Sequence, residues 1–176
     1  MTNNIPVIET ERMHLTAHSV EDFPSMLRMW QDPIATKHIP PGPLSREACW
    51  AIWLQYRGLW AGLGFGYWAI KEKATGAFMG EIGFADFKRD TTPPMAPMME
   101  LGTILHSDYH GQGYGHEAKC AVLNWQAQNF TLPVCCLILP DNQVAIKQAK
   151  KCGFSFNNLI TYGGAQICLG LQNTPE

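Results

Sequence analysis

Residues 100–118 constrain this chain more than any other segment, because three alternating glycines separate an apolar strand pattern from a helix pattern. The glycines are Gly111, Gly113 and Gly115, and a helix-forming run follows over about 116–128. Glycines have no Cβ, so their N–H groups can curve around an anion, and a helix N-terminus adds donors and partial positive charge. The pattern favours a phosphate or pyrophosphate site, and a flexible glycine turn is the alternative.

Two common nucleotide motifs do not fit this segment. A dinucleotide fingerprint has a third glycine at the position where this chain has His116, and a P-loop requires a Gly-Lys pair, which the sequence lacks. An unrelated nucleotide-binding enzyme is therefore a weakened hypothesis.

Composition restricts the class of protein. With 176 residues, we expect one domain spanning residues 1–176. A net charge of −2 gives no general attraction to nucleic acid or to an anionic membrane, so neither is expected as a partner. The first residues do not resemble a signal peptide, and no apolar run approaches 18 residues. The six cysteines include no Cys-x-x-Cys pair, which indicates reduced thiols in a cytoplasmic protein.

Hydrophobic periodicity and capping residues predict the elements. Ser19 and Ser45 are expected to begin two helices, and Asp141 or Asn142 a later one that ends before Gly153. Strands are expected at 10–16, 65–71, 77–84, 99–105, 134–139, 155–160 and 164–171, with a proline-rich loop at 85–98. The order β-α-α-β-β-β-α-β-α-β-β predicts a mixed α/β fold of α+β type.

Three segments resemble one family. The run His110-Gly-Gln-Gly-Tyr-Gly115, followed by Glu117-Ala118, is similar to the acyl-CoA-binding motif of the GNAT superfamily of N-acetyltransferases. The segments 142–154 and 9–15 are similar to the family's asparagine-led helix and to the opening strand of its RimJ/RimL-type ribosomal-protein acetyltransferases. The resemblance spans roughly residues 8 to 171.

The resemblance implies a fold and a ligand. It implies a single GNAT domain with about four helices and a mostly antiparallel central sheet that splays between strands 99–105 and 134–139. The co-substrate would be acetyl-CoA. The implied CoA-binding residues are Leu105, His110, Gly111, Gln112, Gly113, Tyr114, Gly115, His116 and Asn142. For Asn142, a plain helix cap is the alternative. His106 and His110 have a metal-ligand spacing, but they fall in a loop, so no metal is expected.

Acetyl transfer to an amine requires a proton acceptor. The resemblance places Glu100 beside the acceptor as general base, while a solvent-facing or salt-bridged strand glutamate is the alternative; Glu81 is a weaker candidate base. Where family members often have a tyrosine or serine acid, this chain has Ala149 and Ala145. The residues that we consider as substitute acids are Tyr109, His110 and Tyr162.

We expect an acetyl-CoA-dependent N-acetyltransferase, monomeric or homodimeric, that acts on a peptide or small-molecule amine. An α-amine of pKa ~7.8 costs roughly 0.5 kcal/mol to deprotonate at pH 7.4, against about 4 for a lysine-type amine, which favours a peptide N-terminus or a small α-amine compound. The alternative is a GNAT-fold protein that binds acyl-CoA without turnover, as a sensor or interaction module.

Overall fold

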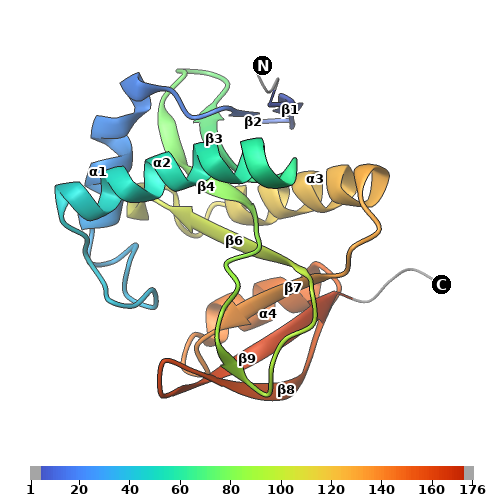
Figure 1. Ribbon diagram of the computed structural model, residues 1–176. Helices are drawn as coiled ribbons and strands as arrows, with labels where there is room; N and C mark the ends of the chain where they lie inside the picture. The colour runs from blue at the N-terminus through green and yellow to red at the C-terminus, as the bar shows by residue number, and fades with distance from the viewer. Residues whose placement is uncertain (1–4, 173–176) are drawn as a thin grey trace. The chain divides into compact units, whose positions relative to one another are not determined.

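The computed structural model describes residues 5–172 and contains nine strands and four α-helices within them. The chain falls into two compact units, one formed by residues 5–83 and 103–125 and the other by 84–102 and 126–172 (Figure 1). The described strand pairs are antiparallel apart from one parallel pair, which confirms a mixed α/β fold. That residues 1–176 form a single domain stays a prediction.

The first unit contains an antiparallel β-meander. The strands β1 (Ile8–Glu9), β2 (Met13–Thr16), β3 (Tyr67–Glu72) and β4 (Phe78–Ala85) pair in that order, and β4 ends in the second unit. A short 3-10 turn, η1 (Val20–Asp22), leads into α1 (Phe23–Gln31). In Figure 1, α2 (Arg46–Leu63) crosses in front of β3 and β4. The Tyr56 ring of α2 stacks on that of Tyr67 in β3 with 4.3 Å between centroids, so the helix packs on the meander.

Local sequence explains the bounds of α2. The Ser45 hydroxyl accepts a hydrogen bond from the N–H of Ala48 at 3.1 Å, and Gly64 ends the helix with a φ of 74°. The first boundary agrees with the expected cap at Ser45. The helix buries residues at helical spacing, which are Cys49, Trp53, Tyr56, Leu59 and Trp60.

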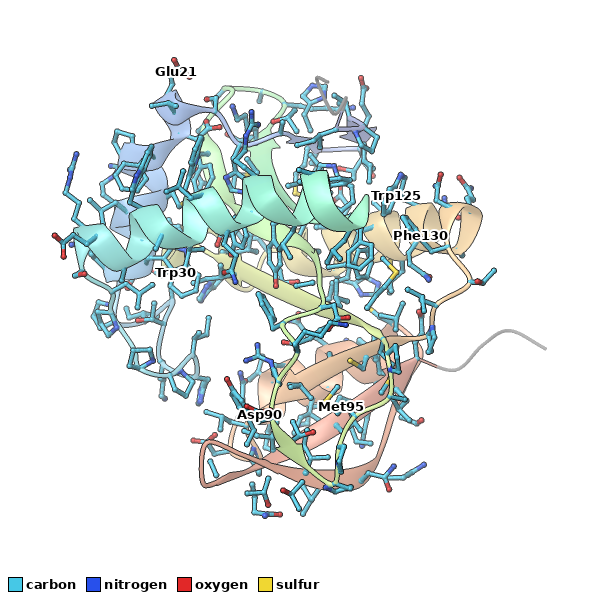
Figure 2. The ribbon with its side chains drawn as sticks, in the orientation of Figure 1. Glu21, Trp30, Asp90, Met95, Trp125 and Phe130 are labelled. Carbon is cyan, nitrogen blue, oxygen red and sulfur yellow. The ribbon has the colours of Figure 1, made fainter. Side chains whose placement is uncertain are left out.

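Three tryptophans form the centre of the first unit's core. The Trp68 ring centroid lies 4.7 Å from that of Trp60 and 4.9 Å from that of Trp125 (labelled in Figure 2), and both contacts are edge-to-face. Trp125 belongs to α3 (Tyr114–Asn129), so this aromatic cluster joins α2 and α3 to β3.

The second unit is built on the last three strands. β7 (Val134–Ile138) pairs with β9 (Ala165–Gln172), β9 with β8 (Phe154–Tyr162), and β8 with the short β5 (Thr91–Thr92), all antiparallel. The helix α4 (Gln143–Lys151) packs on β8. The core residues are Cys135, Ile160, Ile167 and Leu169, with Met95 and Met98 packed against them.

The strand β6 (Met99–Leu105) begins in the second unit and ends in the first. Its pairing with β7 is parallel and limited to Met99 with Val134 and Glu100 with Cys135. This limited pairing is what the predicted splay between these strands requires. At the other end of β6, the N–H of His106 donates to the carbonyl of Met79 at 2.9 Å, which joins this end to the β4 side of the meander.

Four predicted elements differ from the structure. The helix expected to begin at Ser19 starts there as the 3-10 turn η1, and α1 begins only at Phe23. The strand expected at 10–16 is limited to β2 (Met13–Thr16), because residues 10–13 form a turn in which the N–H of Thr10 donates to the carbonyl of Met13 at 2.9 Å, and β1 precedes this turn. The loop expected at 85–98 contains β5, whose two threonines pair with β8. The helix α3 begins at Tyr114 instead of near His116, so Gly115 lies within its first turn. None of the helices in residues 5–172 has the length and apolar character needed to cross a membrane.

Candidate active site

Two glycines shape the loop between β6 and α3. Gly111 has a φ of 75° and Gly113 a φ of 85°, in the left-handed region that other residues avoid. Gly115 lies inside the helix and needs no such freedom. The alternating pattern seen in the sequence therefore reflects two left-handed turns followed by a helix start.

The loop presents unpaired backbone donors. Within residues 5–172, the N–H groups of residues 111–115 donate to no protein acceptor, whereas His116 and Glu117 both donate to the carbonyl of Gly113, at 3.2 and 3.1 Å. Five consecutive donors at the N-terminus of a 16-residue helix are suited to bind an anion. We call residues 110–116 the glycine loop.

Arg12 holds the glycine loop in this shape. Its Nε donates to Oε2 of Glu117 at 2.7 Å, its backbone N–H donates to Oε1 at 2.9 Å, and its Nη1 donates to the carbonyl of Gln112 at 3.0 Å. Its guanidinium also lies 4.1 Å from the centroid of the Tyr114 ring. The hydrogen bond to Glu117 raises the pKa of Arg12, so the guanidinium stays charged.

The other implied CoA-binding residues lie near helix or strand ends. Leu105 is the last residue of β6, and its carbonyl lies 2.9 Å from Nε2 of His110. The side chain of Asn142 accepts a hydrogen bond from the N–H of Ala145 at 3.1 Å and so caps α4. The cap interpretation of Asn142 is confirmed, and its contact with CoA stays a prediction.

Glu100 forms an ion pair in the second unit. Arg89 donates from Nε to Oε2 at 2.7 Å and from Nη2 to Oε1 at 2.9 Å, and the Glu100 side chain is 12% exposed. The Arg89 guanidinium lies 4.7 Å from the Phe87 ring centroid and 4.9 Å from that of Tyr162. Burial is the largest single influence on Arg89 and opposes its charge, but the hydrogen bonds and charges of Glu100 and Tyr162 together outweigh it and raise the pKa of the guanidinium.

A small cavity opens beside this ion pair. It has a volume of about 110 Å³, and we call it the Arg89 cavity. Apolar groups of Phe87, Met95, Met98 and Cys135 line it together with Arg89, Glu100 and the pair formed by Asp86 and Lys88. Burial, reinforced by Glu100, raises the pKa of Cys135 to about 12, so this thiol is neutral and not a nucleophile.

Glu81, the other candidate base, is fully buried in the first unit. Its Oε1 accepts hydrogen bonds from Nε1 of Trp30 (labelled in Figure 2) at 2.9 Å and from the hydroxyl of Tyr56 at 2.6 Å. Burial raises the pKa of Glu81 to about 7 despite these bonds. With no exposed surface, this carboxyl cannot contact an acceptor in the conformation seen.

The tyrosines that we considered as substitute acids lie in different settings. Tyr162 contacts the Arg89 guanidinium, beside Glu100. Tyr109 and Tyr114 lie edge-to-face at 6.1 Å in the first unit, and burial raises the pKa of Tyr109. His110 is occupied by the carbonyl of Leu105. Tyr162 and the proposed base Glu100 thus share one partner, Arg89, in the second unit.

Comparison with known proteins decides the family. The model of the acetyltransferase (GNAT) domain family matches residues 12–155, which is most of the chain. The protein belongs to the GNAT acetyltransferase family. The match covers the glycine loop, Glu100 and Asn142, and begins at Arg12.

Individual relatives are distant. The YkkB protein of Bacillus subtilis (strain 168), itself uncharacterized, is 28% identical over 112 residues, which are 63% of this chain and 62% of YkkB. The chain thus spans less than two thirds of this curated relative. An acetyltransferase from Agrobacterium tumefaciens str. C58 shares the fold with a TM-score of 0.81 at 23% identity, covering 97% of this chain and 95% of that one.

A third comparison is with a ribosomal-protein acetyltransferase. The structure of RimL, a ribosomal L7/L12 α-N-protein acetyltransferase in complex with coenzyme A, matches with a TM-score of 0.76 at 14% identity. The alignment covers 95% of this chain and 97% of RimL. At this identity the similarity establishes the fold alone.

Sequence reasoning missed two residues that shape the site. Arg12 lies about a hundred residues before the loop that it supports, and no local motif connects the two. Arg89 lies in the proline-rich loop expected at 85–98, and its pairing with Glu100 depends on the path of that loop. For Arg12 the available signal was its position in segment 9–15, which resembles the subgroup's opening strand. Arg89 lies in none of the segments that carry the resemblance.

Proposed function

We propose that the protein is an acetyl-CoA-dependent N-acetyltransferase whose acceptor is a primary α-amine, on a peptide N-terminus or on a small compound. The observation that carries this proposal is the row of unpaired N–H groups at residues 111–115, at the start of α3. These donors suit the pyrophosphate of CoA, and family membership supports the same ligand.

Residues of this chain would position acetyl-CoA and accept a proton from the amine. The glycine loop would hold the pyrophosphate, with Arg12 keeping the loop in shape, and the end of β6 at Leu105 would lie along the pantetheine arm. Glu100, on the same strand as Leu105, would take a proton from the amine directly or through one water. The amine nitrogen then forms a bond to the acetyl carbon, the carbon–sulfur bond breaks, and the leaving thiolate takes up a proton.

A proton donor for the leaving thiolate is not essential. A thiol with a pKa near ~8.5 is a tolerable leaving group close to neutral pH, so the alanines at 145 and 149 are compatible with turnover. Tyr162 is the donor that we favour, because it contacts Arg89 beside Glu100. The mechanism that we propose uses no metal.

Calorimetry and a thiol-release assay test the proposal. We expect acetyl-CoA and CoA to bind in the micromolar range and NAD not to bind. We also expect thiol release to depend on an added α-amine, with lysine side-chain amines slower because they are harder to deprotonate. Failure to bind CoA would refute the whole proposal.

Binding without turnover is the second candidate function. The observation that favours it is that both oxygens of Glu100 accept hydrogen bonds from Arg89, which leaves the proposed base engaged. Tight CoA binding without thiol release toward any amine in the panel would support this alternative.

A further inference from the structure

Two opposite charges line the Arg89 cavity at fixed positions. The guanidinium of Arg89 has five N–H donors. Glu100 accepts hydrogen bonds from Nε and Nη2, so the Nη1 group makes no hydrogen bond to Glu100. Each carboxylate oxygen likewise has a further lone pair. The rings of Phe87 and Tyr162 restrain the guanidinium, which makes it a preorganised receptor for a planar anion.

Charge balance indicates which ligand suits this cavity. A simple amine would bring a positive charge beside Arg89, and a simple carboxylate a negative charge beside Glu100. A zwitterion brings both, and leaves the net charge of the partly buried pair unchanged. The other ion pair at the cavity, between Asp86 and Lys88, is already neutral as a pair.

We propose that the Arg89 cavity binds a small α-amino acid as the acceptor, with its carboxylate on Arg89 and its amino group on Glu100. This inference rests on the proposed acetyltransferase function and narrows its acceptor from any α-amine to a free amino acid. Arg89 is then a specificity-determining residue, and the same contact places the nitrogen beside the proposed base.

The size and lining of the cavity fit this ligand. A cavity of ~150 Å³ holds the six heavy atoms of benzene, so about 110 Å³ holds four or five. The amino nitrogen, the α-carbon and the carboxylate together have five heavy atoms. These five atoms account for the enclosed volume, so the methyl group of alanine, a sixth heavy atom, would lie at the open side of the cavity. Met95, Met98 and Phe87 supply an apolar lining that suits a short side chain of this kind.

Binding of L-alanine and of L-alaninamide to the CoA-saturated protein tests the inference by calorimetry. At pH 7 both ligands carry mostly protonated amines, so the comparison isolates the carboxylate. We expect L-alanine to bind at least about tenfold more tightly, because a charge-assisted fork to Arg89 is lost in the amide. Equal affinity, tighter binding of the amide, or no binding of either would overturn the inference.

Matched variants assign the preference to Arg89. Arg89→Gln should reduce the preference for alanine to within about threefold, whereas Lys88→Gln, which removes the other cation at the cavity, should retain it. Unfolding temperature and CoA affinity show whether each variant is folded. If Arg89→Gln does not fold, Arg89→Lys keeps the charge but loses the planar fork, and should show a reduced preference. A full preference in a folded Arg89 variant would contradict the proposal.

The thiol-release assay separates this inference from the proposed function. Turnover of α-amines with no preference for alanine over alaninamide would leave the acetyltransferase standing and refute the amino-acid acceptor. Absence of CoA binding would refute the acetyltransferase itself.

Discussion

Gly113→Ala tests whether the left-handed turns of the glycine loop are needed for binding. Gly113 has a φ of 85°, and a Cβ added there would lie 3.3 Å from Nη2 of Arg12. Gly111 has a φ of 75°, but a Cβ there would meet nothing within 4 Å. The two glycines therefore share backbone strain, and only Gly113 adds a steric contact with Arg12.

The expected magnitude follows from the backbone. A residue other than glycine in the left-handed region costs about 1–2 kcal/mol. At ~1.4 kcal/mol per factor of ten, this corresponds to a roughly 5- to 30-fold change in an equilibrium constant. If the loop keeps its shape, the cost lowers the free energy of unfolding, and if the loop relaxes, the cost weakens CoA binding. Gly113→Ala should weaken CoA binding more than Gly111→Ala does, because relaxation of the loop at Gly113 also displaces Arg12.

CoA affinity by calorimetry and the free energy of unfolding by urea titration should be measured on the same preparations. Gly58→Ala in α2 is the control, because Gly58 is helical, has no neighbour within 4 Å of an added Cβ, and should stabilise the helix slightly. Gly113→Asp adds a charge and should weaken CoA by at least about tenfold. If Gly113→Ala matches wild type in both measurements, the loop does not bind CoA as proposed.

Three further predictions concern side chains. Glu100→Gln should lower kcat more than it raises KM in steady-state thiol release, as expected for a base in the chemical step; unchanged kcat would leave Glu100 with only its ion-pair role. Burial raises the pKa of the Glu81 carboxyl from 4.5 to about 7 in the folded state. Between these two pH values the folded protein binds a proton that the unfolded chain has lost. The free energy of unfolding therefore falls as pH rises from about 4.5 to 7, by at most ~1.4 kcal/mol per pH unit. The difference in unfolding free energy between wild type and Glu81→Gln should therefore change across this window in urea titrations, and a constant difference would contradict the burial argument. Arg12→Gln and Glu117→Gln should each weaken CoA binding several-fold in calorimetry, with a double variant no worse than either; additive losses would mean that the two residues act independently.

Local patterns made much of the fold predictable. Ser45, Asn142 and Gly153 mark helix ends, because caps depend on the chemistry of one residue and its nearest neighbours. The start of α3 was placed about two residues late, because glycines at its first turn signal a loop although Gly115 is helical. The strand β5 was missed, since two threonines beside a proline-rich run form a strand only when β8 is available to pair with them.

Side-chain partners across the sequence could not be predicted in this way. The burial of Glu81 depends on Trp30 from α1 and Tyr56 from α2, and neither helix pattern specifies a shared carboxylate. The pairing of Glu100 with Arg89 also depends on tertiary structure, because the path of the loop brings the two side chains together, although they are only eleven positions apart in the sequence. Sequence therefore identified Glu100 as a candidate base and left open which cation would accompany it.

The hydrogen bonds of Arg12 to Gln112 and Glu117 couple the conformation of the glycine loop to local unfolding of the first strands. Arg12 directly precedes β2, so any local unfolding that frees the β1–β2 hairpin also withdraws the support of Gln112 and Glu117. If the glycine loop binds CoA, thermodynamic reciprocity requires that CoA slow hydrogen exchange in the hairpin to the same extent that an ordered hairpin favours CoA. The first strands of the chain would then act as a reporter of co-substrate occupancy, although they contribute no group to the chemistry.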